Sequence, residues 1–273
     1  MIKIVYAAND KMFDCIYLSV LSILRRTNQD ISFYLLSASF VEIDRKYTIM
    51  SNEHVDILDK LAKSYGDNNS FTLIDCRKEY DKNLKGNKNE KSHYSPYTCL
   101  RLLIDCYPCF DDKVIYLDAD TMAAGDVNEF NKIELGDNEF AVAHDCLGKV
   151  WQYKDCFNAG VMYINMKEAR KNNLFPKARR YLFTKRMYFP DQSALNLAVT
   201  KFMFFPGNEY RFNQQKIKIM PDTVIKHFCA RIKWWPFHNN VKQWDVKNVH
   251  RYLHIHAFDE DFAIYLKMKE TEK

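Results

Sequence analysis

The feature that most constrains this chain is an alternation, in its first half, of short apolar runs with longer stretches whose apolar residues recur at helical spacing. The short runs predict β-strands, at residues 2–7, 31–36, 70–75 and 114–117. The longer stretches predict helices between these strands, at residues 13–25, 51–65 and 92–107. Strands that alternate with helices predict an α/β fold with a mainly parallel central sheet flanked by helices.

The second half continues this pattern less regularly. Residues 140–144 and 161–165 predict two more strands, and residues 190–199 predict a helix that starts at Pro190. Residues 167–184 form a basic amphipathic stretch, which we expect Pro176 to interrupt. From about residue 223 the chain becomes dense in aromatic and basic residues. We therefore expect one large domain, residues 1–235, and a small helical C-terminal extension, residues 236–273.

Composition excludes several classes of protein. Apolar residues make up 47% of the 273 residues, which supports a full hydrophobic core and excludes global disorder. The net charge of +5 is too small to indicate a nucleic-acid-binding protein. The chain has neither a run of about 18 uncharged apolar residues nor the pattern of a signal peptide. We expect a cytoplasmic protein with reduced cysteines, in which Cys106 and Cys109 are structural rather than redox-active.

The strongest chemical signal follows the apolar run at residues 114–117. Asp118 and Asp120 come directly after it, and in extended chain the i, i+2 spacing places both carboxylates on one side of the backbone. Ligands bind beyond the carboxyl ends of the strands in sheets of this kind. Two carboxylates there can share a hard cation, which can bridge a diphosphate. Acidic loops after strands are also common without any ligand.

A third candidate ligand lies far downstream. Residues 223–228 form an apolar run that contains His227, and a neutral imidazole would complete a metal site with Asp118 and Asp120. This ligand set suits Mn²⁺ better than Mg²⁺. Lys233 follows six residues later and could meet a phosphate as a point charge. The alternatives are a hydrogen-bonded structural histidine and a solvated surface lysine.

These pieces, taken together, resemble glycosyltransferase family 8, the retaining nucleotide-sugar group that includes lipopolysaccharide galactosyltransferases and glycogenin. The resemblance covers about residues 1–235 and rests on six segments in family order. They are residues 6–10 (YAAND), 101–102 (RL), 116–120 (YLDAD), 157–161 (FNAGV), 191–196 (DQSALN) and 227–233 (HFCARIK). The resemblance implies a fold of the GT-A type, with a Rossmann-like sheet.

The resemblance also implies roles for individual residues. Asp118, Asp120 and His227 would hold Mn²⁺, with Mg²⁺ as the second choice. The nucleotide-sugar contacts would come from Ala7, Ala8, Asp10, Arg101, Asp118, Ala119, Asn158, Ala159 and Lys233. Asp191, Gln192 and Asp145 would be the catalytic residues near the reacting carbon, and His93 would lie on the acceptor side.

The resulting expectation is a metal-dependent, retaining hexosyltransferase. It would move galactose or glucose from UDP-galactose or UDP-glucose to a hydroxyl of a glycan or glycolipid acceptor in bacterial cell-surface glycan biosynthesis, including lipopolysaccharide biosynthesis. Retention by front-face attack and by double displacement both remain open. The aromatic and basic tail predicts either core packing or peripheral contact with the inner face of the membrane.

Three other functions stay open at this stage. A nucleotidyltransferase is also α/β and metal-dependent, but normally needs a glycine-rich phosphate loop, and residues 7–11 contain no glycine. A nucleotide-sugar-binding protein with degenerate catalysis is compatible with Ser193 and Ala230, which depart from the family pattern. Nucleic-acid binding is disfavoured because the charges are mixed and no recognition motif is present.

Overall fold

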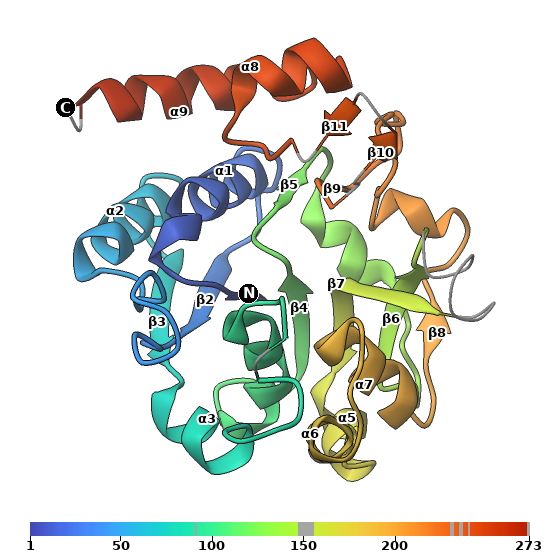
Figure 1. Ribbon diagram of the computed structural model, residues 1–273. Coiled ribbons are helices and arrows are strands. Elements are labelled where there is room, and N and C mark those ends of the chain that lie inside the picture. The colour runs from blue at the N-terminus through green and yellow to red at the C-terminus, as the bar shows by residue number, and fades with distance from the viewer. Residues whose placement is uncertain (91, 147–155, 230–231, 235–236, 240, 272–273) are drawn as a thin grey trace.

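The computed structural model describes residues 1–90, 92–146, 156–229, 232–234, 237–239 and 241–271, with side chains not described for 232–234 and 237–239. Its main feature is a seven-stranded sheet with the order β3-β2-β1-β4-β7-β6-β8 (Figure 1). The strands are β1 (Ile2–Ala7), β2 (Ile31–Ser37), β3 (Ser70–Asp75), β4 (Lys113–Leu117), β6 (Phe140–His144), β7 (Phe157–Asn165) and β8 (Met203–Phe204). β7 runs antiparallel to β4 and β6, and the other neighbouring pairs are parallel. The predicted mainly parallel sheet is thus confirmed.

Helices cover both faces of this sheet. One core contains buried residues of α1 and α2, and the other contains buried residues of α3, η2, α6 and α7. The bounds of the helices are α1 (Phe13–Leu24), α2 (Asn52–Lys63), α3 (Arg77–Asn83), η2 (Pro96–Cys106), α5 (Met166–Lys171), α6 (Leu174–Thr184) and α7 (Pro190–Ala198). Short 3-10 helices over this part of the chain are η1 (Asp10–Met12), η3 (Val127–Lys132) and η4 (Glu209–Arg211).

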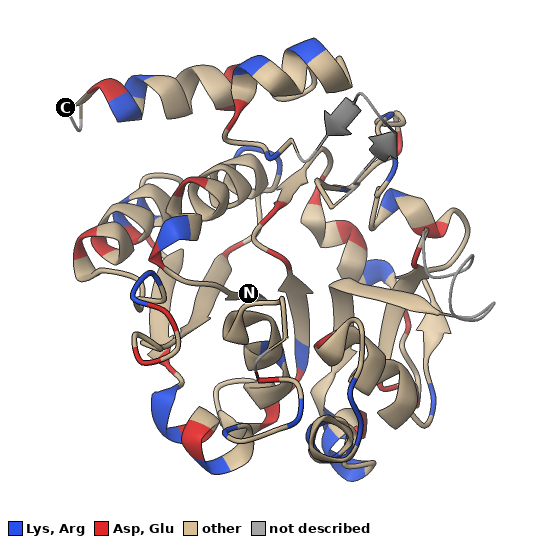
Figure 2. Ribbon diagram, in the orientation of Figure 1, with Lys and Arg blue, Asp and Glu red and all other residues tan. Residues whose placement is uncertain are grey.

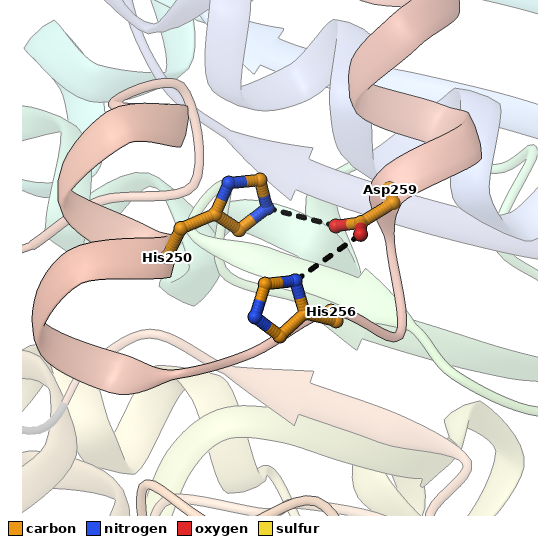
Figure 3. A group of neighbouring side chains, drawn as sticks. All are labelled: His250, His256 and Asp259. Carbon is orange, nitrogen blue, oxygen red and sulfur yellow. Dashed lines mark hydrogen bonds and ion pairs between the residues drawn. The ribbon is translucent and has the colours of Figure 1, made fainter.

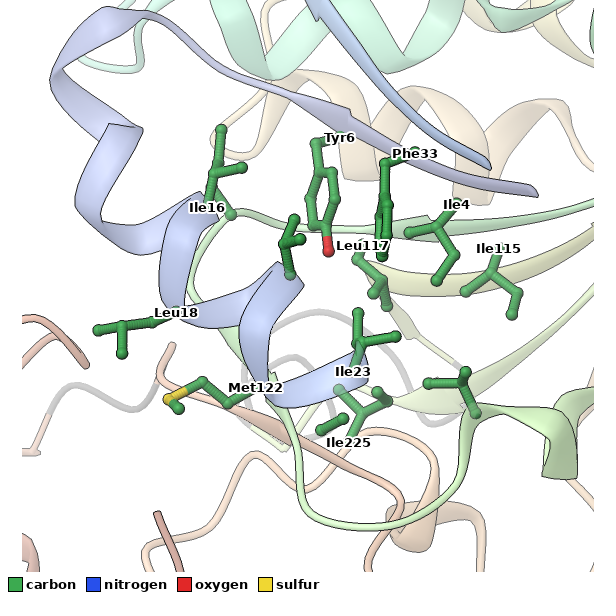
Figure 4. Packing of buried hydrophobic residues seen from close by; sticks show 14 of the residues in the cluster. Ile4, Tyr6, Ile16, Leu18, Ile23, Phe33, Ile115, Leu117, Met122 and Ile225 are labelled. Carbon is green, nitrogen blue, oxygen red and sulfur yellow. The ribbon is translucent and has the colours of Figure 1, made fainter. Parts of the chain in front are cut away.

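Strand periodicity assigns side chains to the two cores. In β4, Ile115 and Leu117 belong to the core beneath α1, whereas Val114 and Tyr116 belong to the core beneath η2. Figure 4 shows Leu117 beside Tyr6 and Ile115 beside Ile4, among the side chains that pack against α1. Because successive side chains of a strand point to opposite faces of the sheet, Tyr116 lies on the face that continues towards the carboxylates after β4.

Two helical predictions differ from the structure. The expected helix at residues 92–107 is a 3-10 helix over Pro96–Cys106, with proline in its first turn. The predicted interruption at Pro176 is wrong, because the break between α5 and α6 falls at Asn173, which adopts a left-handed conformation with φ of 54°. Pro176 lies within the first turn of α6, where backbone amides have no partner inside the helix, so the missing N–H of proline costs nothing there.

The chain after residue 120 adds two small sheets and a C-terminal segment. The sheets pair β5 (Thr121–Ala123) with β9 (Ile225–His227), and β10 (Ile232–Trp234) with β11 (Phe237–Asn239). The segment contains α8 (Val246–Asn248), η5 (Val249–Leu253) and α9 (Asp259–Thr271), and α9 packs on α1 (Figure 1). Asp261 of α9 is fully buried, at 0% exposure, and pairs with Arg25 at 2.8 Å and Arg26 at 2.7 Å.

The tail aromatics divide between the core and the surface. Phe258, Phe262 and Tyr265 belong to the core beneath α1, which is the packing that the sequence offered as one alternative. Trp244 and Tyr252 are exposed. No helix in the described part of the chain is long and apolar enough to cross a membrane. Figure 2 shows both signs of charge on α2, α3 and α9, as expected for mixed rather than one-signed surfaces.

The eight cysteines are free thiols. Cys106 ends η2, and burial raises the pKa of its thiol to about 11, which disfavours the reactive thiolate. Burial also raises the pKa of Cys109. A structural rather than redox-active role for Cys106 and Cys109 stays a prediction, and the raised pKa values agree with it.

Candidate functional site

The antiparallel direction of β7 builds the centre of the site. Since β7 opposes β4, the start of β7 lies beside the carboxyl end of β4, with Leu117 paired to Val161. The next backbone bond joins the Asp118 amide to the Gly160 carbonyl at 2.7 Å. One strand end and one strand start thus place Asp118, Asn158, Ala159 and Gly160 in one small volume.

Asp118, Asp120 and His227 converge as the sequence predicted. The β5–β9 pair places Thr121 opposite His227, so the imidazole lies next to the loop that carries both carboxylates. His227 Nε2 is 3.1 Å from Asp120 Oδ1 and 3.7 Å from Asp118 Oδ2. One potential ligand atom from each residue lies within 4.8 Å of the other two.

The hydrogen bonds of His227 leave one ring nitrogen for a ligand. Asn213 donates its Nδ2 hydrogen to Asn158 Oδ1 at 3.0 Å, so its own Oδ1 accepts from His227 Nδ1 at 3.1 Å. His227 Nε2 is buried and makes no hydrogen bond of normal geometry. An imidazole oriented through its second nitrogen is the usual arrangement of a metal-bound histidine.

Gly160 provides the space for this group. A Cβ added there would lie 2.2 Å from His227 Cε1 and 2.7 Å from Asp118 Oδ2. The imidazole and the carboxylate therefore rest directly on the glycine. With a buried imidazole held through its Nδ1, two carboxylate oxygens that face its Nε2, and the glycine beneath them, these residues fit a divalent cation.

Lys242 is a member of the site that the sequence did not reveal. It comes from the C-terminal segment, and its Nζ contacts Asp120 Oδ2 and donates to the Phe228 carbonyl at 3.2 Å. Burial would raise the pKa of Asp120, but Lys242 and His227 outweigh burial and hold that pKa well below its usual value. Asp120 therefore stays ionised, and a bound cation would compete with Lys242 and with the proton on His227.

Arg101 joins the metal-type centre to a second carboxylate. Its guanidinium donates to Asp118 Oδ1 at 2.7 Å and to the Ala159 carbonyl at 2.6 Å, and its Nε lies 2.9 Å from Asp191 Oδ2. It also lies over the ring of Tyr116, 4.6 Å from the centroid. Burial raises the pKa of Asp191, and Arg101 opposes this shift. Asp105, four residues after Arg101, pairs with Arg179 instead.

A second polar network surrounds Asp145. Its Oδ2 accepts from Asn158 Nδ2 at 3.1 Å and from Gln192 Nε2 at 3.0 Å. Gln192 Oε1 in turn accepts from the Ala159 amide at 3.1 Å. Both ends of the Gln192 amide are thus engaged, and its side chain is held between Asp145 and the Ala159 amide.

These networks face one cavity of about 720 Å³. Its wall includes both carboxylates after β4 and His227, and also residues of α7 and the C-terminal segment. Predicted site residues in the wall are Arg101, Asp118, Asp120, Asp145, Asn158, Asp191, Gln192 and His227. Lys242 also lines it. A cavity of this size can accommodate a drug-sized or nucleotide-sized ligand.

The remaining predicted residues lie around this centre. Ala7 ends β1, which lies next to β4 in the sheet, and Ala8 and Asp10 follow it. None of the three is part of the described wall of the cavity. Asp10 Oδ1 accepts from the Ser51 amide at 2.8 Å and lies 2.7 Å from His54 Nδ1. His93 is exposed, with its ring 5.4 Å from that of Tyr188, which lines the cavity.

The end of the last family segment is described only in part: residues 230–231 lie outside the described residues, and 232–233 are described without side chains. Lys233 lies in β10, and its side chain is outside the described part of the structure. Ala230 lies outside the described residues. Ala119 is buried, and its carbonyl accepts from Gln243 Nε2 at 2.8 Å.

Lys226 is a further supporting residue. Its buried ammonium donates to the carbonyls of Gln214, Lys216 and His227 at 2.9–3.1 Å, and burial lowers its pKa to about 8. These bonds attach the loop that carries Asn213 to β9. A lysine inside an apolar strand was a visible signal in the sequence, whereas Lys242 and Gln243 follow no recognisable pattern.

Comparison with solved structures identifies the class of fold. A galactosyltransferase, LgtC, solved in complex with donor and acceptor sugar analogues, superposes with a TM-score of 0.67 at 20% identity, covering 95% of this chain and 100% of that one. The glycosyltransferase GlyE of Streptococcus pneumoniae TIGR4 gives a TM-score of 0.65 at 19% identity, over 98% of this chain and 63% of that one. The fold is therefore that of GT-A glycosyltransferases.

Sequence comparison identifies the family. The family model described as "Glycosyl transferase family 8" matches residues 3–239, so the chain belongs to this family. A lipopolysaccharide 1,2-glucosyltransferase of Escherichia coli is 28% identical over 249 residues, 80% of this chain and 68% of that protein. A lipopolysaccharide 1,3-galactosyltransferase of Salmonella typhimurium is 27% identical over 202 residues, 67% of this chain and 58% of that protein. The predicted family is thus confirmed.

Proposed function

We propose that this protein is a metal-dependent, retaining hexosyltransferase that moves galactose or glucose from a UDP-sugar to an acceptor hydroxyl. The observation that carries the proposal is the convergence of Asp118, Asp120 and the buried Nε2 of His227 at the cavity. Family membership supports glycosyl transfer. The names of the lipopolysaccharide glucosyl- and galactosyltransferase relatives support a hexose donor and a lipopolysaccharide or other cell-surface glycan acceptor.

In this proposal Asp118, Asp120 and His227 hold the cation, Mn²⁺ in preference to Mg²⁺ because one ligand is an imidazole. The cation would supply charge neutralisation for the departing diphosphate. Lys242 is a second positive group beside Asp120, and Lys233 would be a third. These cationic groups would stabilise the charge that develops on UDP as the glycosidic bond breaks.

The residues around Arg101 fix the geometry of the donor side. Because Arg101 binds Asp118 and Asp191 with different nitrogens, it holds the metal-type centre at a set distance from the α7 carboxylate. Asn158 and Gln192 hold Asp145 in the same cavity. Asp145 and Asp191 are thus the two carboxylates offered to the sugar, and either can serve the retaining mechanism as a nucleophile or as an electrostatic partner.

The outer parts of the site would bind the ends of the two substrates. Ala7, Ala8 and Asp10 would contact uridine beyond the cavity wall, and Ala119 and Ala159 would contribute backbone near the sugar nucleotide. His93, beside Tyr188, would face the acceptor. Residues 1–235 would form the transferase domain and residues 236–273 the extension. We place the protein in the cytoplasm, at the inner face of the membrane.

The exposed Trp244 and Tyr252 would make a peripheral membrane contact in that location. Co-sedimentation with anionic liposomes tests this contact. A Trp244→Ala, Tyr252→Ala double variant should lose binding that the native chain shows. Equal binding by both proteins would remove the membrane contact from the proposal.

The function itself is tested by a panel of UDP-sugars scored for Mn²⁺-dependent release of UDP. We expect UDP-galactose or UDP-glucose to be hydrolysed slowly by the native chain and not by Asp120→Asn. Calorimetry on the same samples should show that UDP binding requires Mn²⁺. Tight UDP binding without release from any sugar would indicate a binding protein instead, and release that is independent of metal and of Asp120 would refute the proposal.

A further inference from the structure

A second group of potential metal ligands lies in the C-terminal segment. His250 of η5, His256 of the following loop and Asp259 at the start of α9 converge in Figure 3. His250 Nε2 is 2.8 Å from Asp259 Oδ1, and His256 Nδ1 is 3.2 Å from Asp259 Oδ2. One ligand atom from each residue lies within 4.8 Å of the other two.

The backbone around this group is held in a defined shape. η5 is a short π-helical turn, and it ends at His254 in a left-handed conformation with φ of 51°. Buried side chains anchor the turn and the loop after it in the core: Val249, Ile255 and Phe258 are at most 4% exposed. π-turns and left-handed non-glycine residues recur at functional sites, where the surrounding packing offsets their cost.

The two imidazoles are arranged as a pair. Their ring centroids are 4.7 Å apart and the planes differ by 17°, so both rings present a nitrogen to the same carboxylate. The ring of His250 also packs 5.8 Å from that of Phe262, which is buried in the core beneath α1. The ligands therefore come from three consecutive elements whose positions are set by the core.

We propose that His250, His256 and Asp259 form a Zn²⁺-binding site that ties η5 to the start of α9. Ligands of a tetrahedral Zn²⁺ at about 2.0–2.1 Å are about 3.3 Å apart. In the metal-free chain the two imidazoles instead hydrogen-bond to different oxygens of Asp259, at 2.8 and 3.2 Å. One ligand atom from each residue lies within 4.8 Å of the other two, so small side-chain rotations would bring the three atoms to the zinc spacing. Two imidazoles with one carboxylate favour Zn²⁺ over Mg²⁺ or Ca²⁺, which prefer all-oxygen sites. Solvent would complete the coordination, since His256 and Asp259 are exposed.

The site is built to be structural and separate from the donor site. It faces solvent on the segment that packs on α1 through Asp261, Arg25 and Arg26. A cation at Asp259 would close the loop of residues 251–258 and hold α9 against α1. The expected consequence of Zn²⁺ is a more stable C-terminal segment, with no requirement for a UDP-sugar.

The test is hydrogen exchange of the metal-free, full-length protein with and without added Zn²⁺. This readout is local, so it separates the C-terminal site from the centre at Asp118. In the native chain, Zn²⁺ should slow the exchange of amides in residues 249–262. In His256→Ala the Zn²⁺ concentration needed for this protection should rise at least about tenfold, since loss of a supporting group alone already costs that much.

Two further variants keep the result interpretable. Asp259→Asn removes a ligand but preserves the shape of the side chain, so it tests the site even if His256→Ala disturbs the fold. It should show the same loss of Zn²⁺-dependent protection. His254→Asn is the matched control, because it removes a neighbouring exposed histidine while asparagine tolerates the left-handed conformation. Its Zn²⁺ response should equal that of the native chain. The proposal would be overturned if Zn²⁺ gave no protection in the native chain, or if His256→Ala and Asp259→Asn were protected at the same Zn²⁺ concentration as the native chain.

Discussion

Replacement of Gly160 by alanine is the sharpest test of the metal-type centre. Gly160 lies within β7, and its backbone is not left-handed, so alanine is compatible with the backbone. The new Cβ would lie 2.2 Å from His227 Cε1, whereas carbon atoms in contact are about 3.5 Å apart. The imidazole would have to move by about 1.3 Å, which is most of a metal–nitrogen bond length.

The displacement predicts a specific pattern of losses. Misplacement of a reacting or binding group by about 1 Å costs about 100-fold in rate. We therefore expect Gly160→Ala to lower Mn²⁺ affinity and UDP release by about 100-fold. Overpacking of this kind costs about 1–3 kcal/mol of stability, so the variant should still fold. Mn²⁺ electron resonance measures the affinity, and circular dichroism on the same sample checks the fold.

A double-mutant cycle with His227→Ala isolates the cause. Once the imidazole is gone, the alanine at 160 has space, so Gly160→Ala should cost much less Mn²⁺ affinity in that background. The residual cost would come from Asp118 Oδ2, 2.7 Å from the added atom. Native Mn²⁺ affinity in a folded Gly160→Ala protein, or strictly additive losses, would refute the geometry of the centre.

Three other substitutions give results of predictable sign. Lys242→Met removes the ammonium from Asp120, so Mn²⁺ alone should bind more tightly, by up to about tenfold or 1.4 kcal/mol. The complex of Mn²⁺ with UDP should bind more weakly, because a positive group near the diphosphate is lost. Calorimetry that shows weaker binding of Mn²⁺ alone would contradict this. Arg101→Lys keeps the charge but cannot reach Asp118, Asp191 and the Ala159 carbonyl together, so kcat/KM for UDP release should fall about 100-fold, and native kinetics would exclude the positioning role. Glu139 is fully buried, at 0% exposure, and burial raises its pKa. The folded state therefore binds more protons than the unfolded state above the ordinary glutamate pKa, and stability falls as pH rises through the folded pKa. Glu139→Gln should raise Tm at pH 7 and flatten its dependence on pH, and a lower Tm for the variant at pH 7 would show that the ionised form is stabilised.

The predictable parts of this molecule are those with local signals. β4 and its two following aspartates were visible because an apolar strand that ends in acidic residues is a short-range pattern. His227 was found because a second apolar run precedes it, and the family resemblance supplied the connection between the two. The same resemblance named Arg101, which the structure shows paired with Asp118 and Asp191; its contact with a nucleotide sugar stays a prediction.

The missed parts depend on contacts between distant segments. Lys242 reaches Asp120 across 122 residues of chain, and Gln243 reaches Ala119 across 124. Neither lies in a periodic pattern, so no rule on the sequence could join them to the site. The break at Asn173 was missed for a different reason: proline was taken as the breaker, although its position in the first turn of α6 is harmless.

Gln243 has a practical consequence for anyone who trims this protein. Its side-chain amide, 0% exposed, donates to the carbonyls of Ala119 at 2.8 Å and Cys15 at 3.3 Å. Deletion of everything beyond residue 240 would remove this donor, and an Ala119 carbonyl that stays dry would cost about 1–3 kcal/mol. The Cys15 carbonyl lies within α1 and keeps its helical hydrogen bond. A shortened version designed for crystallisation should therefore keep the chain at least as far as Gln243, and any purification tag is better attached after α9 than in place of it.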